Sequence, residues 1–203
     1  MQTLILASAS PRRRELLSQA GFVFEVHPAH ISEDPLPDED PIAYVVRLAR
    51  EKAQAVFEER VSHPGDKGVS GDIAPLVVLG ADTTVTLDGH ILGKPEDSAD
   101  AARMLRLLSG RTHWVITGVA VVTAKGVEIA AEVTGVRFLA LSDEEIAKYV
   151  ATGEPMDKAG GYAIQGRAAR WIPRIEGCYF NVVGLPLALV STMLESVNSP
   201  HGD

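Results

Sequence analysis

A strand-to-helix junction sets the fold class, and it reads Leu4-Ile5-Leu6-Ala7-Ser8-Ala9-Ser10-Pro11-Arg12-Arg13-Arg14-Glu15-Leu16-Leu17. The apolar run Leu4–Ala7 predicts a buried strand. Ser10 and Pro11 predict a helix start, because serine caps helix ends and a first-turn proline loses no hydrogen bond. Arginines in the first turn are locally unfavourable, because the helix dipole already makes that end of the helix positive. Together with the exposed backbone amides, this concentration of positive charge indicates a site for a dense anion such as a polyphosphate. The alternative is a basic surface turn.

Helices and strands mix along the rest of the chain. Helical spacing and cap residues predict helices over Pro11–Gln19, Pro41–Arg60, Ser98–Leu108 and Leu185–Val197, and one from a capping box at Ser142 to about Val150. Apolar and alternating runs predict strands over Leu4–Ala7, Phe22–His27, Leu76–Ala81, Val85–Leu87, His90–Leu92, Thr112–Thr123, Val127–Leu139 and Trp171–Ile175, with a hairpin turn at Asp88-Gly89. Hairpins mixed with helical crossovers predict an α/β fold in which helices flank a mixed β-sheet.

Composition restricts the class of protein. A chain of 203 residues suits one domain with a real core. The net charge of −8 disfavours general nucleic-acid binding, although a cleft with concentrated positive charge can still bind a small polyanion. No apolar run is long enough for a membrane span, and a single cysteine, Cys178, excludes an internal disulfide framework. We expect a cytoplasmic protein that binds neither membrane nor nucleic acid.

Four charged residues are candidates for chemistry. Asp82 follows an apolar strand, where an aspartate can hold a divalent cation, accept a proton from water or simply cap a turn. Lys52 flanks the apolar face of a helix, so its ammonium either snorkels to solvent or reaches into a cleft. Lys94 must lie on a turn because Pro95 follows it, and taken alone it is a surface lysine. Glu33, in the acidic loop Ile31–Asp40, is either a second metal ligand or a solvated carboxylate.

One long segment combines charges, glycines, an aromatic ring and an amide: Gly153-Glu154-Pro155-Met156-Asp157-Lys158-Ala159-Gly160-Gly161-Tyr162-Ala163-Ile164-Gln165-Gly166. Glycines allow a backbone to approach a ligand closely, and the Gln165 amide can both donate to and accept from a base edge. The alternative is a structured loop without a ligand. The phosphate-loop pattern of kinases and ATPases is absent from the sequence, which disfavours those classes.

The order of these motifs resembles that of the Maf family, whose members are nucleoside triphosphate pyrophosphatases. The resemblance rests on Ala7-Ser8-Ala9-Ser10-Pro11-Arg12-Arg13, Arg47-Leu48-Ala49-Arg50-Glu51-Lys52-Ala53, Gly80-Ala81-Asp82-Thr83, Gly93-Lys94-Pro95 and Asp157-Lys158-Ala159-Gly160…Gln165-Gly166. It runs from about Leu4 to Leu194. The connection Ser62–Pro75 and the tail Ser199–Asp203 are peculiar to this chain, so we expect a family domain over 1–198 and a tail over 199–203.

The resemblance implies roles for individual residues. Asp82 is the expected catalytic base and, with Glu33, an expected ligand of a divalent cation, Mg²⁺ or Mn²⁺. The expected substrate-binding residues are Ser8, Arg12, Arg13, Lys52, Thr83, Lys94 and Gln165, of which Arg12, Thr83 and Gln165 match specificity positions. Glutamine at position 165 resembles the branch that acts on dTTP and UTP, whereas the 7-methyl-GTP branch usually has glutamate there.

The same resemblance implies the fold and the reaction. We expect two lobes around a cleft, as in inosine triphosphate pyrophosphatases, and a homodimer. The expected reaction is hydrolysis of dTTP and UTP, and of modified pyrimidine nucleotides, to the nucleoside monophosphate and pyrophosphate. The alternative is a nucleotide-binding regulator of septum formation that does not hydrolyse its ligand. A third possibility, a nucleotide kinase or phosphatase, predicts phosphate transfer or release of orthophosphate.

Overall fold

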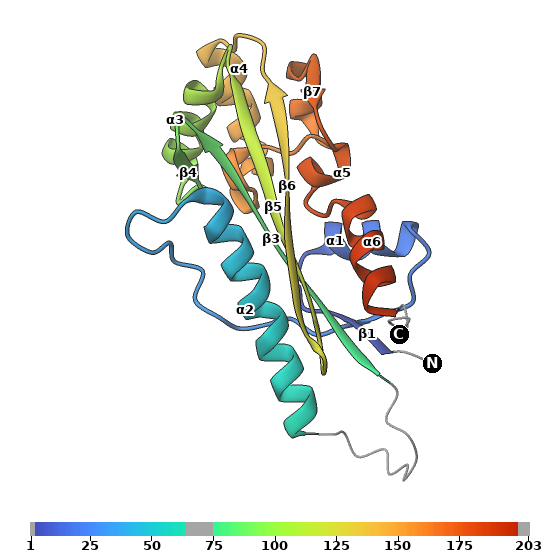
Figure 1. The fold of residues 1–203 in the computed structure, drawn as a ribbon. Helices are drawn as coiled ribbons and strands as arrows, with labels where there is room; N and C mark the ends of the chain where they lie inside the picture. Colours follow the sequence, from blue (N-terminus) through green and yellow to red (C-terminus); the bar gives the residue numbers. More distant parts are fainter. Residues whose placement is uncertain (1–2, 64–74, 199–203) are drawn as a thin grey trace.

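A seven-stranded mixed sheet forms the centre of the protein (Figure 1). The structure, a computed structural model, describes residues 3–63 and 75–198. The strands are β1 (Thr3–Leu6), β2 (Glu25–Val26), β3 (Leu76–Leu87), β4 (His90–Leu92), β5 (Thr112–Thr123), β6 (Gly126–Arg137) and β7 (Arg174–Glu176). Their order is β2-β1-β3-β5-β6-β7, with β4 paired to β3. β1 runs parallel to β2 and β3, and the remaining pairs are antiparallel.

Helices cover both faces of this sheet. They are α1 (Pro11–Gln19), α2 (Pro41–Ser62), α3 (Ser98–Leu108), α4 (Asp143–Val150), α5 (Tyr179–Val183) and α6 (Leu187–Asn198), with 3₁₀ helices η1 (Glu154–Asp157), η2 (Ala159–Gly161) and η3 (Arg167–Trp171). Figure 1 shows α2 along one side of the sheet and α1 with α6 on the other. The predicted mixed α/β architecture is therefore confirmed, whereas the division into two lobes stays a prediction.

Three apolar clusters hold these layers together. Small residues of α2, including Ala49 and Ala53, pack on Val78 and Ala120 of the sheet. On the opposite face, residues of α1 and α6 such as Leu17 and Val190 form the second cluster. The third joins β4, α3 and α4 to the ends of β3, β5 and β6. The last cluster positions the segment after α4, which Figure 1 shows beside α3 and α4.

β3 contains the main departure from the sequence prediction. The apolar run was expected to end at Asp82, but β3 is continuous from Leu76 to Leu87. On one side it pairs with β5 throughout the polar stretch. On the other side β1 pairs with β3 as far as Leu79, and β4 pairs from Val85 onward. Within the described residues, no strand pairs with residues 80–84 on that side, so β3 has an open edge there.

Other boundaries differ in smaller ways. The second strand is only Glu25–Val26, and the strand expected from Trp171 begins at Arg174 because Trp171 ends η3. Sequence reasoning missed α5. The bounds of α1, α3 and β5 and the capping box at Ser142 are as predicted. Residues 64–74 of the expected connection and the expected tail 199–203 lie outside the described residues.

Candidate active site

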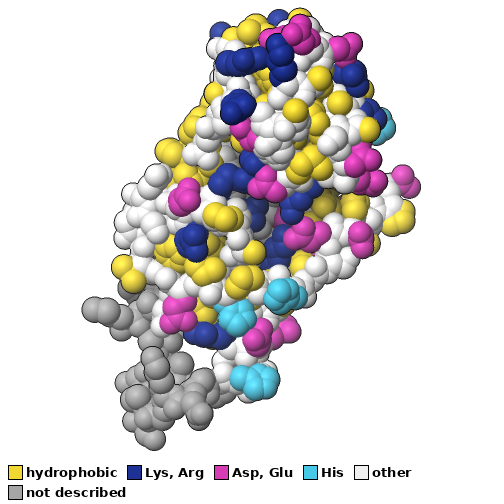
Figure 2. Space-filling view, turned by 180° about the vertical axis from the view of Figure 1, so that it is seen from behind, with side chains coloured by type: hydrophobic (Ala, Val, Ile, Leu, Met, Phe, Trp, Pro, Cys, Tyr) yellow, Lys and Arg dark blue, Asp and Glu magenta, His cyan; other side chains and the backbone are white. Residues whose placement is uncertain are grey.

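A cavity of about 530 Å³ lies at the open edge of β3. It is lined by the β1–α1 loop, α2, the turn after β4, the segment from Asp157 to Gln165 and the residues before α6. The lining includes five cationic side chains and three carboxylates, namely Arg12, Arg13, Lys52, Lys94, Lys158, Glu33, Asp82 and Asp157. Figure 2 shows Lys and Arg side chains gathered at the centre of one face, with carboxylates among them. An acidic protein therefore concentrates positive charge in one cavity.

Asp82 lies within β3 rather than after it, and its side chain points to the α2 face. Its Oδ1 atom accepts a hydrogen bond of 2.6 Å from Nζ of Lys52. The same Nζ lies 2.6 Å from Oε1 of Glu33. Lys52 thus joins two carboxylates, and its buried ammonium reaches the cavity instead of snorkelling to solvent. The hypothesis that Asp82 caps a turn is wrong.

Two glycines allow Lys52 to reach Asp82. A Cβ atom on Gly80 would collide with the backbone oxygen of Ala49, and one on Gly118 would collide with the backbone of Val45. Gly118 pairs directly with Asp82 across β3 and β5. Because both positions lack side chains, α2 lies close against the sheet at this point. The close packing carries Lys52 over the centre of β3.

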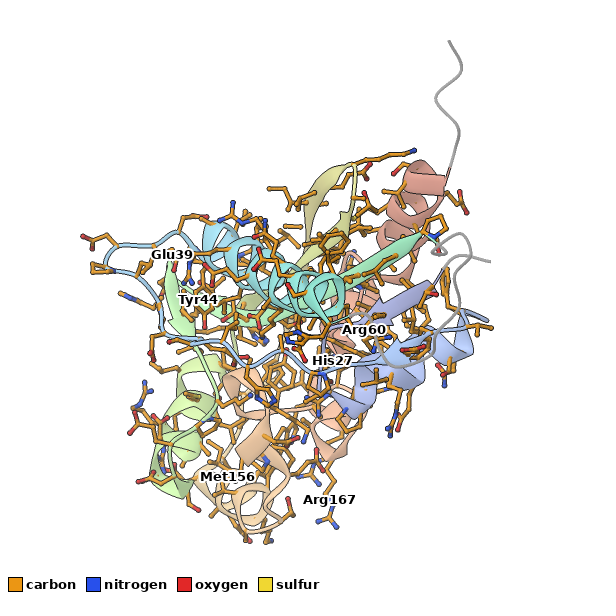
Figure 3. All side chains as sticks on the ribbon, turned by 90° about the horizontal axis from the view of Figure 1, so that it is seen from below. His27, Glu39, Tyr44, Arg60, Met156 and Arg167 are labelled. Carbon is orange, nitrogen blue, oxygen red and sulfur yellow. The ribbon has the colours of Figure 1, made fainter. Side chains whose placement is uncertain are left out.

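The acidic loop before α2 brings Glu33 into the same cluster. The Lys52 ammonium lowers the pKa of Glu33, although partial burial of the carboxylate opposes this effect. Tyr44 donates a hydrogen bond of 2.9 Å from its hydroxyl to the backbone oxygen of Glu33. Burial raises the pKa of Tyr44 to about 12, and the charges of Asp82 and Glu33 add to this. Figure 3 labels Glu39, at the end of this loop, and Tyr44, near the start of α2.

Arg13 connects the start of α1 to the open edge of β3. Its guanidinium donates to the backbone oxygens of Ala81 and Gly184, both at 2.8 Å, and to the hydroxyl of Thr83 at 3.0 Å. A longer contact of 3.3 Å joins it to Ser8 Oγ. Desolvation by burial lowers the pKa of Arg13. The side chain therefore satisfies a buried backbone carbonyl at the edge of β3 that has no described strand beside it, while it lines the cavity.

Thr83 projects from the face opposite Asp82, because successive residues of a strand alternate between faces. Its hydroxyl lies 2.9 Å from that of Thr117. Both Asp82 and Thr83 nevertheless line the cavity. The cavity therefore extends around the unpaired edge of the strand, which explains how consecutive residues with opposite orientations contribute to one site.

Arg12 links α1 to the segment after α4. Its Nη1 atom lies 3.4 Å from a carboxylate oxygen of Asp157, and Lys158 also contacts Asp157. Gln165 lies further along this segment and lines the cavity. Lys94 is exposed on the bend after β4, as expected, and lines the cavity as well. The motifs found separately in the sequence thus meet around one space.

All nine residues proposed from the sequence line the cavity: Ser8, Arg12, Arg13, Glu33, Lys52, Asp82, Thr83, Lys94 and Gln165. Arg14, which the anion-site hypothesis included, is exposed and does not line it. Sequence reasoning missed Tyr44 as a lining residue, and it quoted Asp157 and Lys158 within a motif without giving either a role. Tyr44 precedes Lys52 by eight residues on one helix, and that spacing predicts a shared face.

The two carboxylates near Lys52, Asp82 and Glu33, are the candidate ligands for a divalent cation. Lys52 Nζ lies 2.6 Å from Oδ1 of Asp82 and from Oε1 of Glu33, and no described residue is seen to hydrogen-bond to Oδ2 of Asp82. Among the described residues, no group of three or more His, Cys, Asp or Glu could hold a metal. Mg²⁺ is commonly bound by one or two carboxylates together with water and substrate phosphates. The donor set fits that type of site and not a cage made of protein ligands alone.

The chain is similar to known proteins over nearly its whole length. The model of the Maf-like protein family matches residues 3–197. A protein of Koribacter versatilis named dTTP/UTP pyrophosphatase is 53% identical over 94% of this chain and 92% of its own length. Proteins with the same name from Anaeromyxobacter dehalogenans and Symbiobacterium thermophilum are each 51% identical, over 97% and 98% of this chain and 95% and 96% of their own lengths. The chain belongs to the Maf family.

Proposed function

We propose that this protein is a nucleoside triphosphate pyrophosphatase that hydrolyses dTTP and UTP to the monophosphate and pyrophosphate. The observation that carries the proposal is the Asp82 carboxylate inside a cavity with five cationic side chains. A triphosphate needs cations around it, and its hydrolysis needs an acceptor for the proton of water. The name that the relatives share supplies the substrate class.

In the proposed reaction, a water molecule attacks the α-phosphorus of the nucleotide. The oxygen of water forms a bond to phosphorus, and the bond from that phosphorus to the oxygen bridging the α- and β-phosphates breaks. Asp82 accepts the proton of water through Oδ2, while Lys52 holds Oδ1 in place. Arg12, Lys52 and Lys94 stabilise the charge that develops on the pyrophosphate. Each well-placed donor of this kind is worth about 2.7–4 kcal/mol.

The proposed cofactor is a divalent cation, Mg²⁺ or Mn²⁺. Asp82 and Glu33 are the residues that would hold it. When bound, such an ion neutralises phosphate charge and acts as a Lewis acid at a phosphoryl oxygen. Lys52 already contacts both carboxylates, so it keeps them adjacent before the nucleotide arrives.

We assign recognition of the base to Gln165, with Arg12 and Thr83 at the other specificity positions. Uracil and thymine present an imide N–H between two carbonyls, and a side-chain amide can pair with this pattern through two hydrogen bonds. Gln165 is exposed and lines the cavity, so it is accessible to a base. Modified pyrimidines that keep the imide edge would be recognised in the same way.

The decisive experiment is a substrate screen with purified protein and Mg²⁺ or Mn²⁺. The screen contains dTTP, UTP, CTP, 5-substituted pyrimidine triphosphates and 7-methyl-GTP, and the products are separated by chromatography. We expect pyrophosphate and monophosphate from dTTP and UTP. Binding without any product would instead support the regulator of septum formation. Orthophosphate as the first product would indicate a phosphatase, and either result would contradict the proposal.

Two further expectations belong to this proposal, namely a cytoplasmic location and a homodimer. Among the described residues, the structure contains no helix that is both long and apolar enough to cross a membrane. Light scattering of the full chain tests the dimer, for which we expect twice the chain mass of 21.7 kDa. Fractionation of cells tests the location.

A further inference from the structure

A carboxylate behind the cavity holds the turn that carries Gln165. The turn runs from Ala163 to Arg167 and is closed by a backbone hydrogen bond of 3.0 Å from Gly166 N to the oxygen of Ala163. Arg167 N donates to Oε1 of Glu154 at 3.0 Å and to Oε2 at 3.3 Å. Glu154 therefore satisfies the first backbone N–H of η3, which starts at Arg167. Figure 3 labels Met156 and Arg167, which mark this segment.

Tyr149 holds the other side of the same turn. Its hydroxyl donates to Oε1 of Glu154 at 2.8 Å and accepts from Ala163 N at 3.3 Å. The Tyr149 ring is buried against Trp171, with ring centroids 5.1 Å apart. The phenol and the carboxylate thus bind backbone groups on both sides of Gln165, from a rigid position in the apolar cluster of α4.

The Glu154 carboxylate lies very close to the backbone of Gly166. A Cβ atom at position 166 would collide with Oε1 of Glu154. The backbone of Gly166 has a negative φ of −100°, so a Cβ atom there would be opposed by the Glu154 carboxylate and not by the backbone conformation. The carboxylate is therefore packed directly against the residue that follows Gln165.

We propose that Glu154, together with Tyr149, is a positioning residue that sets base recognition by fixing the turn that carries Gln165. Neither Glu154 nor Tyr149 lines the cavity, so they act through the backbone and not on the substrate. The proposal rests on the proposed function, because it needs Gln165 to contact the base. It assigns no role to Glu154 in binding the phosphates or in the chemical step.

The test compares Glu154→Ala, Glu154→Gln, Gln165→Ala and the double variant Glu154→Ala/Gln165→Ala. For each protein we would measure kcat and KM for dTTP, and the inhibition constant of inorganic tripolyphosphate, which has no base. Glu154→Ala should lower kcat/KM for dTTP by about ten- to a hundredfold, since a small misplacement of a binding group has effects of that size. The change should appear mainly in KM, and the inhibition constant of tripolyphosphate should stay within about twofold of wild type.

Two comparisons separate positioning from a general structural role. Glu154→Gln should stay near the wild-type value, because Oε1 accepts the Tyr149 bond and the shorter of the two Arg167 bonds, and a glutamine keeps that oxygen. The double variant should be no worse than Gln165→Ala, because the support has no function once the amide is gone. Glu144→Ala is the matched control, since Glu144 is an exposed carboxylate whose ion-pair partner among the described residues is Lys148 of its own helix.

Three outcomes would overturn the proposal. The first is equal loss of dTTP and tripolyphosphate binding in Glu154→Ala, and the second is a double variant whose defect multiplies the two single defects. The third is a wild-type protein that hydrolyses no nucleotide, which would refute the proposed function as well and is recognised before any variant is made.

If Glu154→Ala fails to fold, the Tyr149→Phe variant decides between the outcomes, because it removes the hydroxyl and keeps the ring. It should raise KM for dTTP about threefold or more without changing tripolyphosphate inhibition.

Discussion

The Nζ atom of Lys52 lies 2.6 Å from Oδ1 of Asp82 and so connects the longest helix of the described chain to the open edge of β3. The lysine belongs to α2, and the aspartate belongs to a strand thirty residues later. A buried ammonium that binds one carboxylate oxygen leaves the other oxygen for water or metal. The pair therefore orients the proposed base in the absence of substrate.

The first prediction concerns Asp82. Asp82→Asn should lower kcat for dTTP by about 10²- to 10⁴-fold, because it removes the proton acceptor and nearly preserves shape. Nucleotide affinity should change much less, and circular dichroism should show an unchanged fold. Steady-state pyrophosphate release measures the effect. A variant that keeps a rate within about threefold of wild type would refute the role of Asp82 as the base.

The second prediction concerns Lys94, which has no ion-pair partner among the described residues. Its exposed ammonium on the bend after β4 can turn to the phosphates. Lys94→Ala should lower kcat/KM for dTTP and for UTP to the same extent, because the triphosphate is the same in both nucleotides. The control is Lys125→Ala on the β5–β6 turn, away from the cavity, which should leave kcat/KM unchanged. Selective loss of one nucleotide would show that Lys94 contacts the base instead.

Local sequence signals predicted most helices and strands because those signals act within a few residues. Ser10, Asp40 and Asp97 cap α1, α2 and α3 through their side chains, and each helix begins at the next residue. Asp88 and Gly89 both have positive φ, as the predicted two-residue hairpin requires. Such local contacts can be predicted from the residue types and their spacing along the sequence.

The interrupted edge of β3 could not be predicted in this way. Asp82-Thr83-Thr84 reads as the end of an apolar strand because polar residues usually leave a sheet. The strand continues because β5 pairs with it, while β1 and β4 leave a gap on the other side. The site was found from the order of its motifs, and its shape depends on long-range pairing that local patterns do not contain. Tyr44 is a different case, because its spacing of eight residues from Lys52 on α2 is a local signal that was not used.

The third prediction concerns Arg47, which holds the loop that carries Glu33. Its guanidinium binds both carboxylate oxygens of Glu39, at 2.6 and 2.7 Å, and the backbone oxygen of Asp34 at 3.2 Å. These hydrogen bonds lower the pKa of Glu39. Arg47→Ala should therefore free the loop and reduce kcat/KM for dTTP about tenfold.

Arg50→Ala provides the control for Arg47, because Arg50 is an exposed arginine on the same helix. It should leave the kinetics unchanged. Proteolysis under native conditions gives a second readout, since a freed loop is cleaved faster. If Arg47→Ala left both the cleavage rate and kcat/KM at wild-type values, the loop would not depend on this arginine.

The fourth prediction concerns the buried His113. Its Nε2 lies 2.7 Å from the hydroxyl of Tyr162, and burial lowers the pKa of His113 to about 3. In the unfolded chain the His113 ring takes up a proton near pH 6.5, whereas in the folded protein it does so only near pH 3. The stabilisation that depends on a neutral His113 is therefore fully present above pH 6.5, and it is lost as the pH falls toward 3. The expected slope approaches 1.4 kcal/mol per pH unit below pH 6.

Urea unfolding at pH 7.5, 6.0 and 5.0 measures the effect of His113. The comparison variant is His113→Phe, whose ring suits the edge-to-face contacts with Phe138 and Tyr162. Its free energy of unfolding should depend less on pH across this window, even if it is lower at pH 7.5 because Tyr162 loses a partner. Parallel pH profiles of the two proteins would contradict a neutral buried histidine.

The fifth prediction concerns base recognition by Gln165. Gln165→Glu removes the amide donor and places a carboxylate against a carbonyl of the pyrimidine, which leaves an unpaired polar contact. Such a loss costs about 1–3 kcal/mol, so kcat/KM for dTTP and UTP should fall about ten- to a hundredfold. Any weak activity on 7-methyl-GTP should fall less or rise. The comparison is made in one assay of pyrophosphate release with all three nucleotides. An equal loss for every nucleotide would indicate a distorted turn between Ala163 and Arg167 and would remove Gln165 from base recognition.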